Sequence, residues 1–159
     1  QGCDSIVNLS LNLVVCEMKG SSVPESAKCF GDNSGTLTFS IQQGTPPFDY
    51  NWRKVNSTIN GQGMLVNINQ DEIITGLGSG TYLITVTDGF GNDVIIIGTV
   101  NEPLALAATA DVSDFSGYNV SCNGGQNGSI NVNMTGGTQP YSYLWPDGSL
   151  TKNISGLAA

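Results

Sequence analysis

The sequence predicts an all-β protein built from tandem immunoglobulin-like β-sandwich repeats, of which the second is truncated. Three observations support this prediction. Apolar side chains alternate with polar ones in short runs, turn-forming Gly, Pro and Asn separate these runs, and part of the first half recurs in the second. Short strands separated by such turns are typical of a β-sandwich, and no segment has the 3.6-residue period of a helix.

The first alternating run and its neighbour have the pattern of two half-buried strands. In GTLTFSI, Leu37, Phe39 and Ile41 share one face. In PFDYNW, the aromatic residues Phe48, Tyr50 and Trp52 also share one face. We expect a turn between the two runs, and both apolar faces should lie in the core.

The two later runs predict a β-hairpin. TYLITVTD (81–88) and DVIIIGTV (93–100) are joined by GFGN, whose glycines accommodate a tight turn. Asp88, Asn92 and Asp93 surround this turn and are weak candidates for a Ca²⁺ site. The alternative is that their side chains bond the backbone of the turn.

Part of the first half of the sequence recurs in the second half at a fixed offset. Cys29, Gly31, Gly35 and Trp52 each have an identical residue 93 positions later. GSINVNM therefore predicts a second core strand through Ile130, Val132 and Met134, and PYSYLW predicts its neighbour through Tyr141, Tyr143 and Trp145. ITGLGSG matches ISGLAA at an offset of only 80, so the first copy carries an insertion after Trp52.

We expect three parts in the chain. Residues 1–15 would be the terminal strand of a preceding domain, residues 16–102 the first β-sandwich repeat, and residues 103–159 the second. The second repeat lacks a copy of the 81–100 hairpin and is therefore expected to be incomplete. We interpret the chain as an internal piece of a longer secreted protein.

Composition argues against several classes of function. The net charge is −8, whereas nucleic acids and anionic membrane surfaces attract basic proteins. The chain has no His, which excludes Ser-His-Asp and Cys-His catalysis. Asp71 and Glu72 are adjacent, and side chains adjacent on a strand point to opposite faces. We therefore expect no enzyme, no membrane insertion and no cofactor, with Ca²⁺ as the weak alternative.

The repeated motifs resemble those of a known family. Cys-Asn-Gly-Gly-x-x-Gly-Ser from Cys122, Thr-Gly-Gly-Thr-x-Pro-Tyr-x-Tyr-x-Trp from Thr135, and Ser-Gly-Leu from Ser155 are similar to the SprB repeat of very large Bacteroidetes surface adhesins, including gliding-motility adhesins. The resemblance covers most of residues 28–159. It implies a non-catalytic spacer, adhesin or filament at the cell surface, exported by the type IX route. Its partners would be neighbouring repeats, surface glycans or other copies of the chain.

The family pattern also bears on the cysteines. In that family a Cys often follows the hairpin turn and can pair with the Cys that opens the repeat, but here Asn92 stands at that position. We therefore predict a disulfide between Cys16 and Cys29. Cys122 and Cys3 would have partners outside the chain.

Two kinds of glycosylation signal occur. Asp4-Ser5-Ile6 fits the O-glycosylation sequence of that phylum, so Ser5 is a candidate, with an ordinary exposed serine as the alternative. Six Asn-x-Ser/Thr sequons reflect the Asn-, Ser- and Thr-rich composition in a bacterial protein and would be glycan acceptors in a eukaryotic one. They begin at Asn8, Asn56, Asn119, Asn127, Asn133 and Asn153.

If the chain recognises a specific ligand, we expect the site in the insertion, because extra loop length on a rigid scaffold is where binding residues accumulate. The candidate residues are Ser57, Thr58, Asn60 and Gln62. Two alternatives to a structural repeat stay open. One is a carbohydrate-binding module of a secreted polysaccharide-degrading protein, which would stack sugars on aromatic residues such as Trp52 and Trp145. The other is a self-assembling subunit whose incomplete second domain accepts a strand, with 2–15 as the candidate donor.

Overall fold

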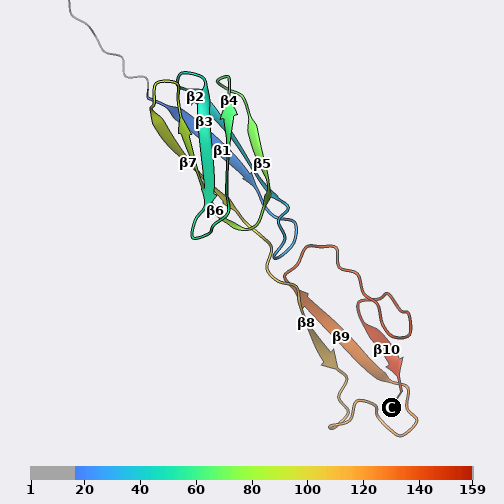
Figure 1. The fold of residues 1–159 in the computed structure, drawn as a ribbon. Coiled ribbons are helices and arrows are strands. Elements are labelled where there is room, and N and C mark those ends of the chain that lie inside the picture. Colours follow the sequence, from blue (N-terminus) through green and yellow to red (C-terminus); the bar gives the residue numbers. More distant parts are fainter. Residues whose placement is uncertain (1–16, 159) are drawn as a thin grey trace, which may run out of the picture. The chain divides into compact units, whose positions relative to one another are not determined.

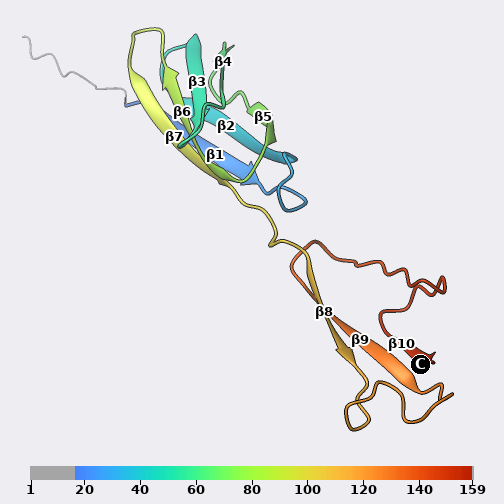
Figure 2. The same ribbon diagram turned by 60° about the horizontal axis from the view of Figure 1, so that its bottom comes forward.

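The computed structural model describes residues 17–158, which contain strands and turns and no helix long and apolar enough to cross a membrane. Figures 1 and 2 show the strands in chain order. The first seven are β1 (Lys19–Glu25), β2 (Gly35–Gln43), β3 (Phe48–Lys54), β4 (Asn60–Leu65), β5 (Glu72–Leu77), β6 (Gly80–Thr87) and β7 (Asp93–Val100). The last three are β8 (Ala107–Val112), β9 (Gly128–Thr135) and β10 (Ile154–Leu157).

The strands form three sheets. Two of them, ordered β1-β2-β5 and β4-β3-β6-β7, contain the strands of the first repeat. The third, ordered β10-β9-β8, belongs to the second repeat, and both of its strand pairs are antiparallel. The all-β class predicted from the sequence is confirmed.

Contacts group the chain into two compact units, and both contain parts of the first two sheets. One unit holds residues 39–72 and 83–97 with the chain up to Ser22, and the other holds 23–38, 73–82 and the chain from Gly98. In the first unit the rings of Phe39 on β2 and Tyr50 on β3 meet edge to face, 5.0 Å between centroids. In the second unit, a Cβ added to Gly98 on β7 would lie 2.3 Å from Leu37 on β2. The two sheets therefore pack against each other in both units, as in a β-sandwich.

The predicted inner face of β2 forms the centre of this core. Leu37, Phe39 and Ile41 are at most 1% exposed, and Phe48 on β3 is fully buried. Burial of such side chains stabilises a fold by about 1.5–3 kcal/mol each, and large rings add the most buried area. The period-two alternation therefore identified the core of the first repeat correctly.

The predicted hairpin of the first repeat is also confirmed as β6 and β7. The Asp88 N–H donates to the Asn92 carbonyl at 2.9 Å, and the Gly91 N–H donates to the Asp88 carbonyl at 2.9 Å. Gly91 has φ +83°, a conformation that favours glycine. Tyr82, Ile84 and Val86 project from β6 into the core and are at most 1% exposed.

The second repeat is open where the first is closed. Its predicted strand exists as β9, but Ile130, Val132 and Met134 are only half-buried. Every residue of β8 is exposed, and among the described residues no hydrophobic side chain beyond Val100 is buried. The core expected around β9 is thus incomplete.

The prediction of a strand through Tyr141, Tyr143 and Trp145 is wrong for the described structure. Residues 141–145 form no strand, although the equivalent residues of the first repeat form β3. The difference is explained by the neighbouring strands, because β3 is hydrogen-bonded to β4 on one side and to β6 on the other. The described part of the second repeat contains no counterpart of either strand, and an isolated strand has no partners for its backbone groups.

Candidate interaction site

The turn between β6 and β7 uses its acidic residue to bind backbone. One carboxylate oxygen of Asp88 accepts from the N–H groups of Phe90 and Asn92, both at 2.9 Å, and the other accepts from the Thr45 N–H at 3.3 Å. Asp93 accepts instead from the Thr87 hydroxyl at 2.6 Å. The two carboxylates therefore bond different groups, which is the turn-bonding alternative raised by the sequence. Ca²⁺ binding at Asp88, Asn92 and Asp93 stays a prediction.

The same bonds set the ionisation of Asp88. Donation by the Asn92 backbone N–H lowers the pKa of Asp88 most, and the opposing effect of burial is smaller. Hydrogen bonds to the charged form of a carboxyl favour that form. The Asp88 carboxylate thus connects the β6–β7 turn to Thr45 through a hydrogen bond. A second hydrogen bond, from the Gly89 N–H to the Thr45 carbonyl at 2.8 Å, joins the same two segments.

The insertion of the first repeat contains a strand, β4, which corrects the expectation of a free loop. Ser57 and Thr58 lie in the turn after β3, where the Ser57 hydroxyl accepts from the Ile59 N–H at 3.2 Å. Asn60 and Gln62 lie on β4. Because Gln62 pairs with Asn51 on β3, its position is set by a strand ladder. Whether these residues recognise a ligand stays a prediction.

Two glycines on β4 make room for two rings of β3. A Cβ on Gly61 would lie 2.6 Å from the Trp52 ring nitrogen, and one on Gly63 would lie 2.4 Å from the Tyr50 hydroxyl. The register pairs Trp52 with Gly61 and Tyr50 with Gly63. The rings thus lie over bare backbone. Tyr50 is buried, which agrees with the core role that the sequence favoured, whereas Trp52 is only half-buried.

Tyr50 also bonds across the sandwich. Its hydroxyl donates to a carboxylate oxygen of Glu72, at the start of β5, at 2.7 Å. Burial, together with this bond and the charge of Glu72, raises the pKa of Tyr50 to about 12. A neutral phenol donating to a carboxylate therefore links β3 to β5.

The glycine-rich loop that opens the first repeat is organised by an acidic residue. Asp32 accepts from the Cys29 N–H at 3.1 Å and from the Ser34 N–H at 3.1 Å. The Ser34 backbone donor is the main cause that lowers the pKa of Asp32. Cys29 carries an exposed free thiol. Its predicted partner Cys16 lies outside the described residues, as do Cys3 and Ser5, so the Cys16–Cys29 disulfide stays a prediction.

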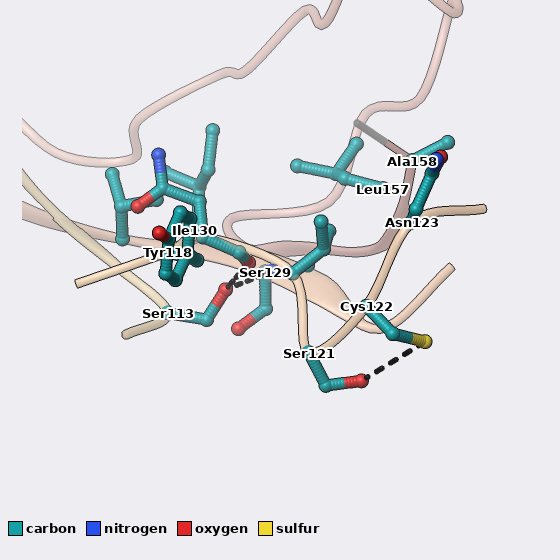
Figure 3. A pocket seen from close by; sticks show the side chains of 13 residues that line it. Ser113, Tyr118, Ser121, Cys122, Asn123, Ser129, Ile130, Leu157 and Ala158 are labelled. Carbon is teal, nitrogen blue, oxygen red and sulfur yellow. Dashed lines mark hydrogen bonds between the residues drawn. The ribbon is translucent and has the colours of Figure 1, made fainter. Parts of the chain in front are cut away.

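The second repeat contains a cavity of about 770 Å³ at one end of its sheet (Figure 3). Its lining combines the end of β8, the start of β9, the end of β10 and the loop between β8 and β9. The labelled side chains Ile130 and Leu157 come from different strands, and Cys122 lies at the rim with an exposed thiol. Most of the lining surface is apolar, which suits an apolar group better than an ion.

Sequence analysis missed part of this lining, the longer loop of the second repeat. Glu25 ends β1 four positions before Cys29, whereas Val112 ends β8 ten positions before Cys122. The added residues form a tight turn, in which the Phe115 N–H donates to the Tyr118 carbonyl at 2.7 Å. The extra residues can be counted in the sequence, but they lie before Cys122, where the aligned segment of the two copies begins.

Comparison with known families agrees with the internal repeat. The family model described as SprB repeat matches residues 21–56 and, separately, residues 118–156. The first match runs from β1 past β3, and the second runs from the cavity loop to β10. None of the curated proteins compared with the chain matches it.

Proposed function

Because the chain belongs to the SprB-repeat family, we propose that it is a non-catalytic structural segment of a large cell-surface protein. The observation that carries this proposal is the double match, since two successive copies of one repeat indicate a chain built by repetition. A segment of this kind spaces and presents other parts of its parent protein.

The finer role follows from the same family. We propose that the parent protein is an adhesin or extracellular filament, that it reaches the surface by type IX secretion, and that the main partners of each repeat are its neighbouring repeats. The charge of −8 supports an extracellular role, because net charge of one sign keeps a protein soluble. Binding of surface glycans and calcium remains secondary to this proposal.

Surface labelling of intact cells tests the location. Antibodies raised against the 159-residue chain are expected to label unpermeabilised cells of the source organism, and protease added to intact cells is expected to remove the label. A cytoplasmic protein probed in parallel controls for lysis. Labelling that requires permeabilisation would contradict the proposal.

Shear resistance tests the function. Cells whose parent gene lacks the segment encoding both repeats are expected to detach from a surface at lower flow than wild-type cells. Cells that carry a same-length replacement by other β-sandwich repeats are expected to behave as wild type, because a spacer acts through its length and stability. Full loss of attachment in the replacement strain would instead indicate a specific binding site within the chain.

A further inference from the structure

A groove lies on the outer face of the four-stranded sheet of the first repeat, away from the core. Its volume is about 470 Å³, and its lining comes from β3, β4 and β6, which are neighbours in the sheet. The side chains that line it are those of Asp49, Asn51, Gln62, Met64 and Thr87. All of these residues belong to one compact unit of the chain. The groove is therefore a feature of a single unit.

The strand register places four of these side chains next to one another. Asn51 on β3 pairs with Gln62 on β4, and Asp49 pairs with Met64. Directly opposite residues of an antiparallel pair point to the same face, with Cβ atoms about 4.5–5.5 Å apart. All four are exposed, whereas Tyr50, between Asp49 and Asn51, is buried on the other face. Two amides, a carboxylate and a thioether thus share one exposed surface.

The polar side chains of the groove are not used to hold the fold. Among residues 17–158, the side chains of Asp49, Asn51 and Gln62 have no hydrogen-bond or ion-pair partner. Asn60, which was also expected to recognise a ligand, instead donates its side-chain amide to the Thr58 carbonyl at 2.9 Å. Polar groups on strands are held at fixed spacing, and here they remain available to a ligand.

The second copy of the repeat does not reproduce the groove. At the offset of 93, Ser142 stands in place of Asp49, and Leu144 stands in place of Asn51. Strand β4 belongs to the insertion that the second copy lacks, and it lies outside residues 21–56, which match the SprB-repeat model. Because both copies match that model, the repeat fold does not require these polar side chains.

The chemistry of the lining suits a neutral ligand rich in hydroxyl groups. The Asp49 carboxylate and the net charge of −8 disfavour an anion. A single carboxylate is poorly suited to Ca²⁺, which takes about six to eight oxygen ligands. A sugar hydroxyl both donates and accepts, so it matches amides, which also do both, and a carboxylate, which accepts. Met64, at 58% exposed, offers an apolar surface to the C–H groups of a sugar ring.

We propose that this groove binds a neutral oligosaccharide. Sugar hydroxyls donate to the Asp49 carboxylate and bond the amides of Asn51 and Gln62, while the C–H face of a ring packs on Met64. The volume lies within the range of about 300–1,000 Å³ that is typical of small-ligand sites. The site differs from the stacking of sugars on Trp52, because it uses the outer face of the sheet. It also goes beyond the proposed spacer function, since a spacer needs no ligand.

Titration of the full 159-residue chain with neutral trisaccharides, followed by ¹H–¹⁵N NMR, tests the proposal. The probes are maltotriose, laminaritriose, mannotriose and triacetylchitotriose. We expect at least one of them to shift the amide signals of residues 49–51 and 62–64 in a saturable way, with residues 141–145 unchanged. The surface labelling described above does not depend on this result, so the two proposals can fail separately.

Variants of exposed residues test the assignment of the site. The double variant Asn51→Ala/Gln62→Ala is expected to weaken binding of the sugar by at least about tenfold, because both amides that bond it are removed. Gln43→Ala removes an exposed glutamine amide at the end of β2, outside the groove, and is the matched control. It should bind the sugar as wild type does. Unchanged amide signals of β2 in the double variant would verify that its fold is intact.

Three outcomes would overturn the proposal. The first is the absence of a saturable shift with all of the trisaccharides, and the second is equal binding by the double variant and wild type. The third is a set of shifts centred on residues 141–145, which would assign sugar binding to the aromatic segment of the second repeat instead.

Discussion

The Tyr50 hydroxyl illustrates how one buried polar group affects stability at the residue scale. Its bond to Glu72 crosses from β3 to β5, and both burial and the neighbouring carboxylate disfavour the phenolate. The unfolded chain exposes an ordinary tyrosine with a pKa of about 10. Folding therefore raises the pKa of this group, and the linkage acts at alkaline pH.

We predict that the free energy of unfolding decreases between pH 10 and about 12 because of Tyr50. A raised folded pKa gives stability that is complete below the unfolded pKa and is lost as pH rises through the folded one, here at most about 3 kcal/mol. Urea unfolding followed by tryptophan fluorescence measures it. Tyr50→Phe should be less stable at pH 7 and less sensitive to alkali, with Tyr118→Phe, which is exposed, as the control. Equal alkaline sensitivity of the Tyr50→Phe variant and wild type would contradict the prediction.

At the scale of the element, alternation predicted strands correctly where a partner strand was present in the ladder. β2, β6 and β7 formed as expected, and their apolar faces are buried. Residues 141–145 share the aromatic alternation of β3 but form no strand, because local pattern sets which face is apolar and does not supply ladder partners. The insertion of the first repeat shows the converse case, in which a partner strand is present although the local sequence does not predict a strand. Its polar, glycine-rich sequence is typical of a loop, yet pairing with β3 makes it β4.

The glycines of β4 lead to a prediction about this element. Gly63→Ala should destabilise the first repeat by about 1–3 kcal/mol, because the added methyl overlaps the Tyr50 ring and forced repacking of a core costs about this much. It should also lower the alkaline sensitivity described above, since the displaced ring loses Glu72. Chemical denaturation of Gly63→Ala measures both effects. Gln62→Ala, exposed on the same strand, is the matched control. A variant as stable as wild type would show that the ring moves aside without loss.

At the scale of the whole molecule, the internal repeat predicted more than any single motif. It indicated two copies of one fold and an unmatched hairpin in the second, and the open face of β9 agrees with this. The cavity was not predictable, because it depends on the space above Gly128 rather than on any residue type. The longer loop before Cys122, in contrast, is visible in the sequence as extra residues between Val112 and Cys122.

The difference in burial predicts unequal stability of the two copies in the isolated chain. Leu37, Phe39 and Ile41 on β2 are sealed from solvent, whereas their counterparts on β9 are half-exposed. Local opening costs least where few apolar contacts are broken, so amide hydrogens of β9 should exchange at least about tenfold faster than those of β2 under native conditions. Exchange measured peptide by peptide tests this in the unmodified protein. Leu37→Ala provides the control, because it should accelerate exchange in β2 and leave β9 unchanged. Equal protection of the two strands in the wild-type chain would contradict the prediction.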